Sequence, residues 1–178
     1  GPSIYNGFDW PILMPHLDHM AGYARQHTGA YRSEFFRTFK APHALIGTWT
    51  GYGADQVFIR DSVWWEVLSG FFCPAYYCTD YLHTKGMNET EDARDLAKTF
   101  AEIKSGIGKL IMGGARLEDP IAVHHSFLNC VTLQVSNARG EGVTSDTYYL
   151  ALDAWTQLLH ELGYQFRFVD RRQLKNGE

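Results

Sequence analysis

The stretch that decides the fold is His43-Ala-Leu-Ile-Gly-Thr-Trp-Thr-Gly-Tyr-Gly53. The apolar residues at 44–48 predict a strand, and a loop with Trp49, Tyr52 and two glycines follows them. A helix is then expected at 55–68. This order of strand, loop and helix indicates a βα unit. Aromatic and hydroxyl side chains at such a junction are typical of a site for a polyhydroxylated ligand, since rings cover C–H patches and hydroxyls take the hydrogen bonds.

The same alternation continues along the rest of the chain. Strands are expected at 17–23, 75–80, 120–124 and 164–169, and helices at 31–40, from Asn88 to the glycines at 113–114, and at 146–162. The pattern predicts a buried-type strand at 120–124 and places Trp155 on a core-facing stripe. Residues 126–135 fit either element. The fold class is therefore α/β with parallel βα units, but about five strands are too few for a closed (β/α)8 barrel.

Composition excludes several classes of protein. The chain has 178 residues, a net charge of −4 and a pI near 6.1, which argue against a nucleic-acid binder. A hydrophobic content of 45% is enough for a core, and no apolar run approaches the length of a membrane span. The three cysteines (Cys73, Cys78 and Cys130) form no dense framework. We therefore expect reduced thiols in a cytoplasmic protein.

Carboxylates close to aromatic residues are the candidates for acid–base chemistry. Glycoside hydrolysis needs two carboxylates that flank the scissile bond. Asp9, Asp18, Glu66 and Asp80 lie near the ends of predicted elements. Asp18 and Glu66 are the weak catalytic candidates, although the helical position of Glu66 favours a buried ion pair with Arg60. No catalytic pair is identified.

Metal and cofactor motifs are weak in this sequence. His124 and His125 are adjacent on a predicted strand, so their side chains point to opposite faces and cannot easily share one ion. No G-x-S-x-G turn surrounds Ser126, and the glycines at 106–108 and 113–114 do not open a helix after a strand. We expect no metal and no cofactor.

Several segments together resemble one enzyme family. They are Gly7-Phe-Asp-Trp10, the residues at 17–23, Phe35-Phe-Arg-Thr-Phe39, the stretch at 46–53, Trp64-Trp65-Glu66-Val-Leu-Ser-Gly70, the residues at 102–110, and Asp119-Pro-Ile-Ala-Val-His-His-Ser126. They are similar to the C-terminal half of a clan A glycoside hydrolase barrel of the β-galactosidase-like type. Residues 155–163 and 166–170 resemble the first helix and second strand of the flavodoxin-like trimerisation domain that follows such barrels.

The resemblance implies a domain organisation and a function. Residues 1–136 would form a partial barrel-like domain and residues 145–178 the start of a trimerisation-like α/β domain, with a linker at 137–144. The parent reaction is retaining hydrolysis of a β-glycoside. By analogy, Trp49, Tyr52 and Trp65 would contact sugar, and Asp9 and Asp18 would be polar residues of the cleft.

The catalytic residues of that family do not carry over to this chain. Its nucleophile position falls in Thr48-Trp49-Thr50, which contains no Glu, and the strand that bears its acid/base Glu is missing. We therefore expect a fragment or truncated relative that self-associates as a homo-oligomer through uncovered sheet edges. The alternative is a non-catalytic carbohydrate-binding or assembly module. An α/β enzyme of unrelated type is a third reading.

Overall fold

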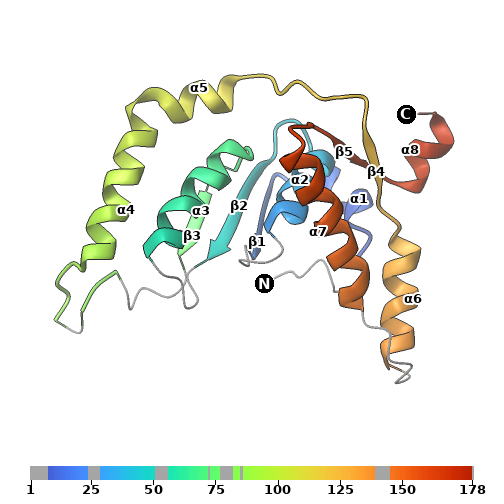
Figure 1. Ribbon diagram of the computed structural model, residues 1–178, viewed down its shortest axis with the longest axis horizontal. Helices are drawn as coiled ribbons and strands as arrows, with labels where there is room; N and C mark the ends of the chain where they lie inside the picture. Colours follow the sequence, from blue (N-terminus) through green and yellow to red (C-terminus); the bar gives the residue numbers. More distant parts are fainter. Residues whose placement is uncertain are drawn as a thin grey trace. The chain divides into compact units, whose positions relative to one another are not determined.

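The computed structural model describes residues 8–23, 29–50, 56–71, 73–76, 82–84, 86–138 and 145–177 (Figure 1). Its internal contacts divide the chain into two compact units. Unit 1 comprises Gly1–Asp18, Arg25–Ala44 and Arg116–Glu178, and unit 2 comprises His19–Ala24 and Leu45–Ala115. This division differs from the boundary at 137–144 that the sequence suggested, because the elements on both sides of that segment belong to unit 1.

A three-stranded parallel sheet forms the centre of unit 2. Strands β1 (His19–Tyr23), β2 (Leu45–Thr50) and β3 (Cys73–Tyr76) lie in the order β1-β2-β3. The predicted strands at 17–23 and 44–48 are thus confirmed, and the one at 75–80 begins earlier than expected. Ile46 is fully buried in the apolar run of β2. Burial of such runs on both faces is what parallel sheets require.

Helix α3 (Gln56–Leu68) connects β2 to β3 and matches the predicted helix. Val63 and Val67 are buried on it. The chain leaves α3 through Gly70, whose φ of +82° is a left-handed conformation that a residue with a Cβ rarely adopts. Val63 packs with Leu96 of the next helix, and these two residues form the core of this part of unit 2.

A long helical segment follows in unit 2, made of α4 (Glu91–Glu102), a π-helical turn at Ile103–Ile107, and α5 (Gly108–Gly113). The side chain of Thr90 accepts a hydrogen bond from the Ala93 N–H and caps α4, so the helix begins after Thr90 and not at Asn88 as expected. Gly108 permits the π-turn, because a Cβ there would lie 2.6 Å from Cγ2 of Ile103. The predicted stop at 113–114 is confirmed.

Helix α2 (Gly29–Phe39) lies at the centre of unit 1 and packs against α7 (Ser145–Glu161) and β5 (Arg167–Val169) (Figure 1). Aromatic rings fill the core between these elements. The fully buried ones are Tyr31, Phe35, Phe36, Phe166 and Phe168. Such rings provide much of the apolar area that a small unit buries.

The second sheet belongs to unit 1 and pairs β4 (Ala122–His124) with β5 in parallel. The prediction of a buried-type strand at β4 is wrong, because Ala122 and His124 are exposed. The ambiguous segment after it forms α6 (Phe127–Ala138). Unit 1 also contains α1 (Trp10–Leu13), the 3-10 turn Met14–His16, and α8 (Arg171–Asn176), which Asp170 begins with a capping box.

Helix α7 carries apolar residues on both of its faces. Tyr149 and Leu152 are buried, but the Trp155 side chain is 57% exposed, so its assignment to the core is wrong. The chain is therefore mixed α/β with short parallel strand pairs, as the sequence predicted. The partial barrel and the flavodoxin-like segment stay predictions, since the two described sheets have three and two strands.

Candidate functional site

The carboxyl ends of β1, β2 and β3 lie side by side at one edge of the parallel sheet. Tyr23 ends β1 and is paired in register with Trp49, and Thr50 ends β2 and is paired with Tyr76, the last residue of β3. Open α/β sheets bind their ligands outside this edge. The side chain of Trp49 and all of Tyr52 lie outside the described residues, so their proposed sugar contacts stay predictions.

Helix α3 presents its two tryptophans differently. The Trp65 side chain is 42% exposed, whereas Trp64 is half-buried. Successive residues of a helix point about 100° apart, so the two side chains differ in exposure. Trp65 is thus partly exposed at the surface of unit 2.

Glu66 lies on the inner face of α3, where its side chain is 2% exposed. Burial raises its pKa to about 7, and the Thr48 hydroxyl on β2 opposes this rise. However, neither Glu66 oxygen nor Thr48 Oγ1 has a hydrogen-bond partner within the described part of the chain. Glu66 therefore forms no ion pair with any described side chain. The expected partner, Arg60, has a side chain outside the described part of the chain, so that pair stays a prediction. This burial is unfavourable for contact with a substrate.

Asp18 directly precedes β1 and so lies at the amino end of that strand. Its side chain is 95% exposed, and its Oδ1 is 3.1 Å from Nε2 of His43, which itself precedes β2. The carboxyl ends of parallel strands are at the opposite edge. Asp18 is thus at the end of β1 opposite to the aromatic residues. This position is unfavourable for a catalytic role at the carboxyl edge.

Asp9 belongs to a polar group near the carboxyl end of β5 in unit 1. Burial raises the pKa of Asp9, while the charge of Arg172 and the Ile12 N–H lower it and Asp170 raises it further. Asp170 follows β5 directly and holds Arg172 through its carboxylate. Two carboxylates and one guanidinium therefore share this end of the small sheet.

His125 follows β4 at the same end of this sheet. Its Nδ1 is 3.3 Å from the Tyr31 hydroxyl, and its ring lies edge-on against Phe35 at 4.6 Å. Burial lowers its pKa to about 4, with a further contribution from His124, so the ring is neutral at physiological pH. His124 is exposed, as expected for adjacent strand residues that point to opposite faces. No group of three His, Cys, Asp or Glu residues able to hold a metal is found among the described residues.

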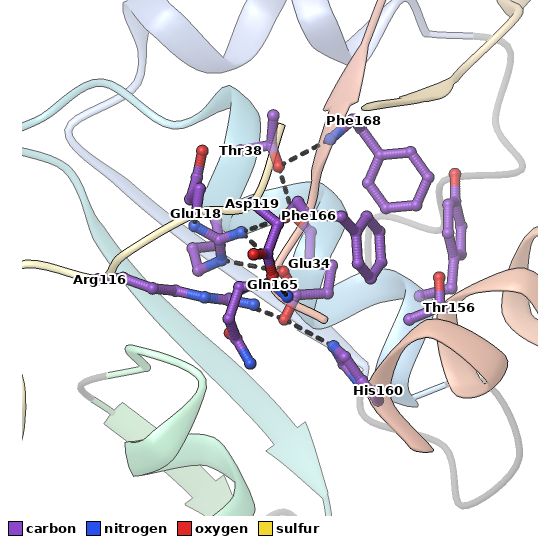
Figure 2. A network of polar contacts seen from close by, with 12 residues as sticks. Glu34, Thr38, Arg116, Glu118, Asp119, Thr156, His160, Gln165, Phe166 and Phe168 are labelled. Carbon is purple, nitrogen blue, oxygen red and sulfur yellow. Dashed lines mark hydrogen bonds and ion pairs between the residues drawn. The ribbon is translucent and has the colours of Figure 1, made fainter. Parts of the chain in front are cut away.

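The largest polar network surrounds Glu34 of α2, a residue that sequence reasoning missed (Figure 2). Arg37 Nη2 and Arg116 Nη1 approach its carboxylate at 2.7 and 2.9 Å, and His160 Nε2 lies 3.2 Å away. Burial would raise the pKa of Glu34, but these three groups together lower it to about 2. Every carboxylate oxygen is already bound, so the network joins elements of unit 1 and leaves no open position for a ligand.

No family model, curated protein or solved structure matches this chain. None of the described helices is long and apolar enough to cross a membrane. Of the predicted site residues, Trp49 stands at the aromatic edge of unit 2, Trp65 is exposed on α3, and Asp9 belongs to the polar group of unit 1.

Proposed function

We propose that this chain binds a carbohydrate at the carboxyl edge of β1, β2 and β3. The observation that carries the proposal is the register that sets Tyr23 beside Trp49 and Thr50 beside Tyr76 at the ends of three neighbouring strands. Aromatic residues supply flat apolar faces that cover the C–H groups of a sugar ring, and hydroxyl groups supply directional hydrogen bonds. The glycines and Tyr52 that follow β2 in the sequence add to this composition.

The wider proposal is that the chain is a fragment or truncated relative of a glycoside hydrolase whose parent reaction is retaining hydrolysis of a β-glycoside. It rests on the segments that resemble this family and on the βα order of unit 2. The alternative is a non-catalytic carbohydrate-binding or assembly module. The positions of Glu66 and Asp18 favour this alternative, because one carboxylate is buried beneath the sheet and the other lies at its amino end.

Tryptophan fluorescence during titration with mono- and disaccharides tests the binding proposal. Trp49→Ala is expected to weaken saccharide binding at least about tenfold, which corresponds to roughly 1.4 kcal/mol. Trp155→Ala is the matched control, since Trp155 is exposed on α7 of unit 1. Equal affinity of Trp49→Ala and the wild type, or no saccharide binding by the wild type, would refute the proposal.

Turnover of nitrophenyl β-glycosides separates the enzyme from the binding module. The wider proposal requires turnover that falls in Asp18→Asn or Glu66→Gln. Saccharide binding without turnover would assign this chain to the non-catalytic class.

A further inference from the structure

Among the described strands, β4 has a neighbour on only one of its two edges. The Ile121 C=O accepts from the Arg167 N–H at 3.2 Å, and the His125 N–H donates to the Val169 C=O at 2.8 Å. Backbone groups alternate between the two edges of a strand, so those of Ala122 and His124 point away from β5. Within the described ranges these groups have no hydrogen-bond partner.

The opposite edge of this sheet is closed by side chains of α2. Arg37 Nη2 donates to the Phe166 C=O at 2.9 Å, and the Phe168 N–H donates to Thr38 Oγ1 at 3.2 Å (Figure 2). These bonds engage the Phe166 C=O and the Phe168 N–H, and α2 packs along this edge of β5. The two-stranded sheet can therefore gain a further strand only beside β4.

The free edge is short and follows Pro120, but it carries no charged side chain of its own. The segment Ile121-Ala-Val-His-His125 contains no Lys, Arg, Asp, Glu or Pro, and Ala122 and His124 are exposed. Exposed edges without such residues accept another extended chain. The backbone N–H and C=O groups of such an edge repeat every second residue. They can therefore bind another chain in the strand conformation, whatever its sequence.

We propose that β4 pairs antiparallel with β4 of a second copy of this chain, around a two-fold axis at Val123. Under this symmetry Ala122 of one copy faces His124 of the other, and each such pair exchanges two hydrogen bonds. Because the segment carries no formal charge, the two β4 strands do not repel each other. Leu117 and Leu128, which precede and follow β4 in the sequence, are both largely exposed. Because the β5 edge is closed, association stops at a dimer.

Sedimentation equilibrium of the whole chain over a range of concentrations tests this proposal. The wild type is expected to show a concentration-dependent monomer–dimer equilibrium. Ala122→Pro removes an outward N–H and leaves the bonds between β4 and β5 in place, so it is expected to weaken dimerisation at least about tenfold. Ala122→Val, which keeps the N–H, is expected to dimerise like the wild type. Far-UV circular dichroism checks that both variants are folded.

A charge pair provides a second test that does not depend on proline. His124→Lys and His124→Glu place like charges diagonally across the axis, so each variant alone is expected to dimerise less than the wild type. An equimolar mixture of the two is expected to regain the dimer. A wild type that stays monomeric at all concentrations, or equal dimerisation of Ala122→Pro and Ala122→Val, would overturn the proposal. Failure of the mixture to recover would overturn the antiparallel pairing.

Discussion

His160 Nε2 on α7 lies 3.2 Å from Oε1 of Glu34 on α2, although the two residues are 126 positions apart in the sequence. The same carboxylate binds Arg116, which belongs to the segment that leads to β4. Arg37 extends the network to Glu118 and to the backbone of β5. The buried carboxylate thus connects α2 directly to α7 and to the segment before β4, and through Arg37 to β5.

Replacing Glu34 by Gln is expected to destabilise the protein strongly. The change leaves Arg37 and Arg116 without their buried counter-charge, and breaking a buried ion pair in this way costs roughly 3–5 kcal/mol. Urea unfolding followed by circular dichroism measures the loss. Glu118→Gln is the control, because its ion pair with Arg37 is more exposed and should contribute less than about 1 kcal/mol. Equal losses for the two variants would contradict the central role of Glu34.

Acid is expected to remove the contribution of Glu34. Its pKa is about 2 in the folded protein and 4.5 as the reference value, so the folded state favours the ionised form. The stabilisation is complete above the unfolded pKa and disappears as the pH falls from about 5 towards 2. Unfolding free energies measured along this pH range should decrease more steeply for the wild type than for Glu34→Gln. Parallel curves would mean that Glu34 is not paired in solution.

Glu66 is expected to have the opposite pH dependence. Its folded pKa of about 7 lies above the reference value of 4.5, so the folded state favours the protonated form. Stability is full below about pH 4.5 and decreases as the pH rises through 7, by an amount that approaches roughly 3 kcal/mol. Glu66→Gln should therefore exceed the wild type in unfolding free energy by more at pH 8 than at pH 5. Asp61→Asn, on the exposed side of the same helix, should show no such difference.

Gly70 is expected to be required at the end of α3. Its φ of +82° would force an alanine into the left-handed region, at a cost of about 1–2 kcal/mol. Gly113→Ala is the comparison, since Gly113 has no such φ and no atom near the position of a Cβ. Thermal unfolding of the two variants should therefore lower the melting temperature only for Gly70→Ala.

The sequence predicted the elements of unit 2 well because their signals are local. The apolar run before Trp49 and the glycine at position 70 mark the beginning and end of a βα unit without any tertiary information. Trp155 was misassigned because α7 is apolar on both faces, so its periodicity does not say which face is buried. Similarly, Thr90 and Asn88 are both good caps, and only the geometry selects Thr90.

The polar clusters could not be predicted for a different reason. Glu34 is a single carboxylate in an aromatic helix, and its partners Arg116 and His160 carry no motif that connects them to it. The burial of Glu66 depends on how α3 packs against β2. Asp9 is next to aromatic residues in the sequence, but its neighbours Asp170 and Arg172 become apparent only in the folded unit.

Hydrogen–deuterium exchange with and without a saturating saccharide tests the central claim most directly. Carbohydrate binding at the carboxyl edge predicts slower exchange in peptides that cover the ends of the strands, at 22–28, 49–55 and 75–81. Peptides at the amino ends, at 16–19 and 43–45, should exchange at the same rate in both conditions. Protection confined to the amino ends or to unit 1, or no protection at a saccharide concentration that saturates binding, would contradict the proposed carbohydrate site.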